Sequence, residues 1–112
     1  MKKILFCGMT GDLLCVKHVL LNALSLKKRG HDVQVVFEGE SVRLLPKLYH
    51  ENNPLYFEAQ ELGLLSGVCL TCARSLGVYE ALLPLGLPFL EELMGHFDMA
   101  PSLEAGYEVI VL

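Results

Sequence analysis

The chain has 112 residues, of which 53% are hydrophobic and 20% are charged, and its net charge is −4 at pH 7. This length suits one domain, so we predict a single domain over residues 1–112. A charged share below the usual value of about 25% excludes a disordered chain and indicates a packed core. A negative net charge, with no basic cluster larger than Lys27-Lys28-Arg29, argues against a nucleic-acid partner.

Short apolar runs alternate with longer amphipathic segments along the chain. In chain order, we predict strands at Lys2–Gly8, Asp32–Phe37, Leu64–Leu70 and Tyr107–Leu112, and helices at Leu13–Arg29, Val42–Leu45, Pro54–Leu62, Thr71–Leu76 and Pro88–Phe97. Ser41 is expected to cap the second helix and Pro46 to stop it, and the Leu/Pro-rich segment Tyr79–Pro88 receives no assignment. The alternation predicts an α/β fold, a three-layer αβα sandwich of the flavodoxin-like type with a mostly parallel sheet of about four or five strands.

The length of the apolar runs bears on the compartment. No run reaches the roughly 18 uninterrupted apolar residues of a membrane-spanning helix, and the first run ends at Gly8, which is short for the core of a signal peptide. We therefore expect no membrane contact and a cytosolic protein whose four cysteines are reduced thiols.

The predicted helix Leu13–Arg29 carries apolar residues on most of its circumference. Even its polar arc, which holds Lys17 and Asn22, includes Leu14 and Leu21. Two interpretations stay open: a well-buried helix in a leucine-rich protein, or a subunit interface. A small monomer buries only about two-thirds of its unfolded surface, so the apolar surplus favours a homo-oligomer.

Three features of the sequence fall at the carboxyl ends of predicted strands, where open parallel sheets gather ligands and reactive groups. Cys7 lies near the end of the first strand, Glu38 comes directly after the second, and Cys69-Leu70-Thr71-Cys72 ends the third and opens a helix. A thiol at such a junction faces unpaired backbone N–H groups, which favour the thiolate. Cys69 is thus the predicted nucleophile, with Cys72 beside it, while Cys7 and Cys15 are expected to pack as small apolar residues.

Other interpretations of the C-x-x-C pair are weaker. A thioredoxin-like dithiol comes after an early strand, whereas this pair comes after the third. A zinc site needs further ligands, and the sequence has no second C-x-x-C and no H-x₃₋₅-H, so zinc would require Cys7 or a distant histidine. The four histidines share no spacing, although His96 can approach the site. We therefore predict no metal and no cofactor.

Residues Gly8 to Asp12 match neither a P-loop nor a dinucleotide-binding motif. We interpret the segment as a tight turn that forms one wall of the cysteine pocket, with Asp12 as the N-cap of the next helix. The residues predicted to line the pocket are Gly8, Thr10, Gly11, Asp12, Glu38 and Thr71.

Two segments resemble the DsrE/DsrF-like family, which includes TusD-type sulfur-relay proteins. One is Leu26-Lys27-Lys28-Arg29-Gly30-His31-Asp32-Val33, and the more specific one runs from Gly67 through Cys69-Leu70-Thr71-Cys72-Ala73 to Val78. The resemblance implies a sulfur carrier that holds a persulfide at the position of Cys69, receives sulfur from a donor protein and passes it to an acceptor protein. It also implies a trimer, or a hexamer built from trimers.

The sequence thus predicts a sulfur carrier or a component of a sulfurtransferase that works through thiol chemistry at Cys69. Two alternatives stay open. One is an oligomeric binding or assembly module that keeps the fold without the chemistry. The other is a regulator that binds a small molecule or a metal.

Overall fold

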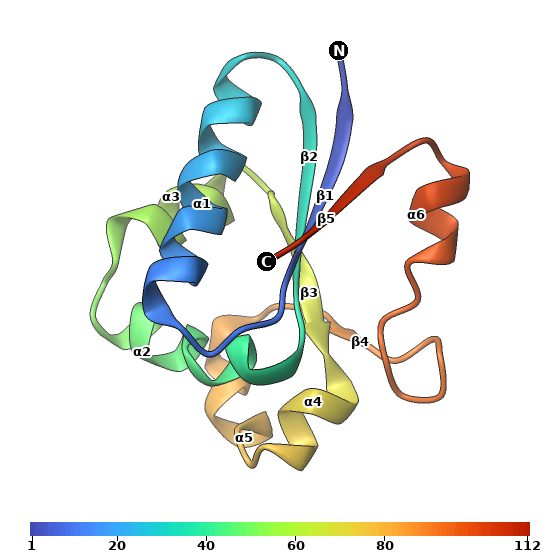
Figure 1. Cartoon of the computed structure of the whole chain (residues 1–112). Helices are drawn as coiled ribbons and strands as arrows, with labels where there is room; N and C mark the ends of the chain where they lie inside the picture. Colours follow the sequence, from blue (N-terminus) through green and yellow to red (C-terminus); the bar gives the residue numbers. More distant parts are fainter.

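The computed structural model describes residues 1–112 and is built around a parallel sheet. Its strands are β1 (Lys3–Gly8), β2 (Asp32–Phe37), β3 (Leu65–Cys69), β4 (Phe89–Leu90) and β5 (Glu108–Val111). They lie in the order β4-β3-β2-β1-β5, and every neighbouring pair is parallel (Figure 1). The predicted α/β class with a parallel sheet is therefore confirmed.

The alternation of side chains in β1 decides what each face of the sheet buries. Ile4 and Phe6 belong to a core cluster of 21 buried residues. Leu5 and Cys7 belong to a second cluster of only 3 buried residues, on the opposite face. The two faces of the sheet are thus packed to very different depths.

The deeper face is covered by α1 (Leu13–Lys28), α2 (Leu45–His50) and α3 (Pro54–Glu61) (Figure 1). The start of α1 is fixed as predicted, because the backbone N–H of Leu14 donates a 2.9 Å hydrogen bond to the Asp12 carboxylate. None of the helices combines the length and apolar character that a bilayer-spanning segment needs.

The shallower face carries one short helix, α6 (Ala100–Glu104), and the irregular segment that precedes it (Figure 1). Phe97 and Tyr107 pack there against Leu5 and Val36. The second helical layer of the sandwich is therefore thin.

The predicted helix Pro88–Phe97 is wrong. Phe89 and Leu90 pair with Val68 and Cys69 as edge strand β4, and the backbone N–H of Val68 donates to the Pro88 carbonyl. Gly67 permits this contact, since a Cβ atom there would lie 2.7 Å from the Pro88 oxygen. Pairing with β3 outweighed the local helix signal of a proline followed by apolar residues.

The prediction around Ser41 and Pro46 also needs correction. Ser41 lies inside a 3-10 helix, Gly39–Arg43, and its hydroxyl does not cap a helix after it. Pro46 stands in the first turn of α2, where its missing N–H costs nothing, so it opens a helix instead of stopping one.

At the carboxyl end of the sheet, β3 runs directly into α4 (Leu70–Ser75), and α5 (Tyr79–Leu82) comes next. Both helices lie below the strand ends in Figure 1. The Leu/Pro-rich segment, for which the sequence predicts no element, thus forms α5, a 3-10 turn at Leu83–Leu85, and the approach to β4. These elements close the end of the sheet where the cysteines gather.

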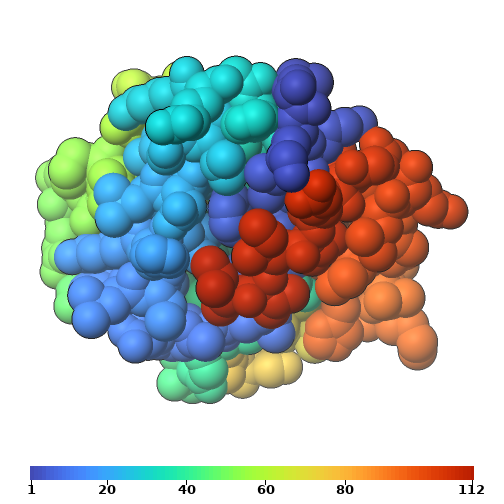
Figure 2. All heavy atoms as spheres, turned by 45° about the horizontal axis from the view of Figure 1, so that its top comes forward, coloured from blue at the N-terminus to red at the C-terminus, as the bar shows by residue number.

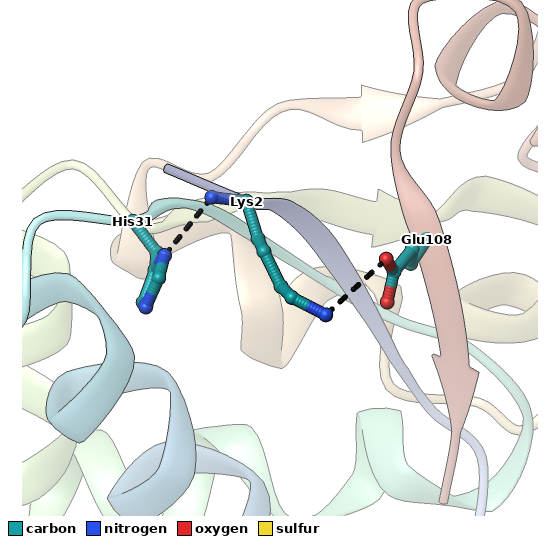
Figure 3. A network of polar contacts seen from close by, with 3 residues as sticks. All are labelled: Lys2, His31 and Glu108. Carbon is teal, nitrogen blue, oxygen red and sulfur yellow. Dashed lines mark hydrogen bonds and ion pairs between the residues drawn. The ribbon is translucent and has the colours of Figure 1, made fainter.

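The amino end of the sheet is held by polar side chains on its surface (Figure 3). The backbone N–H of Lys2 donates a hydrogen bond of 3.0 Å to Nδ1 of His31. The side-chain ammonium of Lys2 lies 3.7 Å from the Glu108 carboxylate. This network links the starts of β1, β2 and β5.

Candidate thiol site

The sheet register brings the predicted reactive residues together at one end. Cys7 of β1 pairs with Val36 of β2, and Phe37 of β2 pairs with Val68 of β3. Because parallel strands end at the same edge of a sheet, Cys7, Glu38 and Cys69 lie in succession across the three strand ends.

The Cys69 thiol has a histidine partner. Its Sγ lies 3.3 Å from Nδ1 of His96, which is within hydrogen-bonding distance for sulfur. Cys72 completes the group: its Sγ, the Cys69 Sγ and a ring nitrogen of His96 all lie within 4.8 Å of one another. We refer to Cys69, Cys72 and His96 as the thiol site.

A tight hairpin presents His96 to the two cysteines. Leu93 and His96 exchange two backbone hydrogen bonds of 2.9 Å. Between them, Met94 and Gly95 both take positive φ values, 49° and 91°. Such a turn has its two central residues in the left-handed region, which glycine tolerates best.

Thr71 fastens this hairpin to the start of α4. The carbonyl oxygen of Gly95 accepts a hydrogen bond of 3.0 Å from the Thr71 backbone N–H and one of 2.8 Å from its hydroxyl. A Cβ atom on Gly95 would collide with the Thr71 hydroxyl. Thr71 therefore holds the hairpin that carries His96, through the carbonyl group of Gly95.

Burial is graded across the thiol site. The Cys69 side chain is fully buried, Cys72 is half-buried, and His96 is exposed. Solvent therefore reaches the site past Cys72 and His96, while the Cys69 sulfur lies beneath them.

Cys7 and Glu38 form a second layer beside the thiol site. Burial raises the pKa of the Cys7 thiol to about 12, and the neighbouring Glu38 carboxylate adds to the rise. Burial also raises the pKa of Glu38, against the opposing effects of hydrogen bonding to Cys7 and of the His96 charge. Cys7 is thus a neutral packing residue at physiological pH, as predicted.

Cys72 shares this protected environment. Burial raises the pKa of its thiol, and the neighbouring Cys69 and Glu38 add to the rise, whereas the backbone N–H of Gly39 opposes it. The Cys72 thiol therefore favours its neutral form.

The expected source of thiolate stabilisation at Cys69 needs correction. Cys69 occupies the N-cap position of α4, but its side chain makes no hydrogen bond to the helix. Instead the sulfur faces the His96 ring. The imidazole of His96, and not a helical N–H group, is therefore the hydrogen-bonding neighbour of the Cys69 sulfur.

The predicted pocket wall is only partly present. The carbonyl oxygen of Gly8 lies 2.7 Å from the buried Ser41 hydroxyl, which lies equally close to the Glu38 carbonyl oxygen and so ties the ends of β1 and β2. Thr10, Gly11 and Asp12 are exposed. Asp12 caps α1, and Gly11 faces Glu40, so this turn supports the start of α1.

His96 is the residue to which sequence reasoning gave too little weight. It lies 27 positions from Cys69, in a segment predicted to be helical. The available signal was Gly95, a residue that favours turns over helix interiors, directly before the histidine. The remaining histidines lie elsewhere: His31 on the amino end of the sheet, and His18 and His50 on exposed helix surfaces.

The fold and the site together define a small α/β protein with two thiols and an imidazole at the carboxyl end of a parallel sheet. The chain matches no family model. It is 34% identical over 95 residues to the uncharacterized protein MJ0733 of Methanocaldococcus jannaschii, and the match covers 85% of this chain and 78% of that protein. The chain therefore belongs to the same family as MJ0733.

Its fold is shared with a solved structure. The conserved protein of unknown function BT1422 from Bacteroides thetaiotaomicron superposes with a TM-score of 0.76, covering 99% of this chain and 95% of that one, at 19% sequence identity. At this level of identity the likeness concerns the fold alone.

Proposed function

We propose that this protein is a sulfur carrier of the DsrE/DsrF-like type, which holds sulfur as a persulfide on Cys69. The observation that carries the proposal is the 3.3 Å separation between the Cys69 Sγ and the Nδ1 of His96. A thiol becomes a nucleophile by losing its proton, and a hydrogen-bonded imidazole is the usual base for that step. The resemblance of the Cys69–Cys72 segment to that family supports the same chemistry.

The reaction needs no external oxidant. His96 accepts the Cys69 proton, and the thiolate attacks the outer sulfur of a donor persulfide, R–S–SH. A new S–S bond forms on Cys69 while the donor S–S bond breaks, and the donor leaves as a thiolate that takes the proton back. In the second half, an acceptor thiolate attacks the outer sulfur on Cys69, which leaves as the thiolate.

The graded burial of the site suits a carrier. A persulfide on the buried Cys69 is shielded from oxidants, and donor and acceptor approach on the side of the half-buried Cys72. All four cysteines are free thiols. The proposal therefore places the protein in a reducing compartment such as the cytosol.

Cys72 supports a competing reaction. Attack of its thiolate on the inner sulfur of the Cys69 persulfide would release hydrosulfide and leave a Cys69–Cys72 disulfide. The separation of the two sulfurs, within 4.8 Å, makes this step accessible. Cys72→Ser is therefore expected to prolong the life of the persulfide.

The test is mass spectrometry after incubation of the reduced protein with a small persulfide donor. We expect a mass increase of one sulfur atom on Cys69, loss of that adduct in Cys69→Ser, and at least tenfold slower formation in His96→Asn. Cys15→Ser is the matched control, since Cys15 lies on α1 and outside the thiol site. An adduct that persists in Cys69→Ser, or that never forms on the unmodified chain, contradicts the proposal.

We also propose that the protein assembles as a trimer or hexamer. The supporting observation is apolar surface on α1 and β5: Leu14 is 75% exposed, Leu21 51% and Val111 56%. Leu112 borders a hollow of about 260 Å³ with Leu14, Cys15 and His18, and Figure 2 shows the red chain end beside the blue α1. Light scattering should give about three or six times 12.4 kDa for the unmodified chain and a smaller mass for Leu14→Glu. A monomer or dimer of the unmodified chain would overturn this assembly.

A further inference from the structure

We propose that Cys69, Cys72 and His96 bind one zinc ion per chain, through two thiolates and an imidazole nitrogen. This inference uses the same side chains as the sulfur-carrier proposal but goes beyond it. It concerns the protein before any persulfide is loaded, and it adds a ligand class that sulfur transfer does not need.

The spacing of the donor atoms fits a tetrahedral ion. Zinc bonds of about 2.3 Å to sulfur and about 2.0 Å to nitrogen, at a tetrahedral angle, place ligand atoms about 3.5–3.8 Å apart. The Cys69 sulfur and the His96 nitrogen are 3.3 Å apart, and no pair among the three donor atoms exceeds 4.8 Å. A shift of about 1 Å in side-chain positions therefore suffices to complete the coordination.

The chemistry of the donors selects the metal. Two thiolates and an imidazole are soft to borderline ligands, which favour zinc over magnesium or calcium. Two thiolates also neutralise the charge of a divalent ion, so its transfer into a half-buried site leaves no uncompensated charge. Because thiolates and not thiols bind the metal, binding releases the thiol protons.

The supports of the site are already in place. Cys69 and Cys72 are fixed by the junction of β3 and α4, and His96 is held by the hairpin that Thr71 fastens through two hydrogen bonds to Gly95.

The coordination has an open position. Three side chains supply one donor atom each, and the exposed ring of His96 leaves the ion facing solvent. Sites with three protein ligands and a water are the arrangement in which zinc reacts with exogenous groups. The open position would take water or a small anionic sulfur ligand such as hydrosulfide or a thiolate.

The experiment is a titration of the reduced, metal-free full-length protein with Co²⁺ and then Zn²⁺. We expect one Co²⁺ per chain, with a sulfur-to-cobalt charge-transfer band and the visible bands of a tetrahedral ion, and displacement of Co²⁺ by Zn²⁺. Cys72→Ser and His96→Ala should each weaken binding at least tenfold, while Cys15→Ser should leave binding unchanged. Circular dichroism confirms that each variant is folded, and the half-buried position of Cys72 makes Cys72→Ser the decisive variant.

Absence of stoichiometric binding, or binding that Cys72→Ser leaves unchanged, overturns the inference. Its failure is distinguishable from that of the sulfur-carrier proposal because the persulfide assay is run on metal-free protein. A persulfide without zinc binding removes the zinc site alone, and zinc binding without a persulfide removes the sulfur carrier alone.

Discussion

Each end of the sheet has a histidine in a side-chain hydrogen bond, but the contacts at the amino end are exposed whereas Cys69 at the carboxyl end is buried. At the amino end, Lys2, His31 and Glu108 meet on the surface, and the side chains of the Lys2–Glu108 pair are each 64% exposed (Figure 3). At the carboxyl end, Cys69 is fully buried against His96. A histidine thus accepts a backbone hydrogen bond at one end and contacts a thiol at the other.

The difference comes from the segments that cover each end of the strands. At the carboxyl end, β3 continues at once into α4, and the hairpin Leu93–His96 folds back over the junction. These segments bury the Cys69 sulfur, and electrostatic interactions are stronger in such a low-dielectric environment. At the amino end, solvent screens the charges of Lys2 and Glu108. Their ion pair therefore adds little to stability.

The largest effect is expected from a methyl group added at the carboxyl end, and the same change at the amino end is its control. Gly95→Ala places a Cβ against the Thr71 hydroxyl at a φ of 91°. We expect the free energy of unfolding to fall by about 2–4 kcal/mol, with loss of the His96 contact and of persulfide formation.

Gly106→Ala is the matched change at the amino end. Its φ is 94°, but the nearest atom to the added Cβ is 4.0 Å away. Only the backbone cost of about 1–2 kcal/mol should appear in urea unfolding, and reactivity at Cys69 should be unchanged. If Gly95→Ala and Gly106→Ala reduced the reactivity of Cys69 equally, the thiol site would not depend on the hairpin at the carboxyl end.

The second effect concerns Ser41, which ties β1 to β2 near the thiol site. Ser41→Ala removes a buried hydroxyl that lies 2.7 Å from the carbonyl oxygens of both Gly8 and Glu38. We expect a loss of about 0.5–1.5 kcal/mol in chemical denaturation, because a hydroxyl hydrogen bond at the ends of β1 and β2 is lost. A change below about 0.5 kcal/mol would mean that water replaces the hydroxyl.

Alkaline pH provides a third comparison. The folded-state pKa of Cys7 is raised from 9.0 to about 12, so the unfolded chain ionises first as the pH rises. The stability contribution is fully present below pH 9.0 and is lost progressively up to about 12, by at most about 1.4 kcal/mol per pH unit. Tyr56, whose pKa is raised from 10.0 to about 12 by burial, adds a parallel loss.

Cys7→Ala should therefore flatten the decline of the unfolding free energy that begins near pH 9.0, and Tyr56→Phe the part that begins near 10.0. Unfolding curves at a series of pH values measure both. An unchanged slope in both variants would indicate that these side chains ionise freely in the folded protein.

The smallest effect is expected at the amino end. Glu108→Gln removes an ion pair of 3.7 Å whose side chains are largely exposed. The unfolding free energy should change by less than about 0.5 kcal/mol, and added salt should abolish the difference. A larger, salt-resistant loss would show that this surface network stabilises the strand ends as strongly as the buried one.

Much of the fold was predictable because its signals are local. The apolar runs of β1 and β2, the Asp12 cap and Gly30, which comes after the C-cap residue of α1, all act within a few residues. Edge strand β4 and the hairpin were not predictable in this way. Phe89 and Leu90 form a strand only because β3 offers unpaired backbone groups beside them.

The sequence by itself determined the α/β class, the position of Cys69 at a strand-to-helix junction, and the presence of Cys72 nearby. The tertiary structure alone decided that Cys69 is buried, that helical N–H groups do not contact its sulfur, and that His96 does. The physical reason is that a contact spanning 27 residues depends on how the sheet edge and the hairpin close over the strand end, which no local pattern encodes.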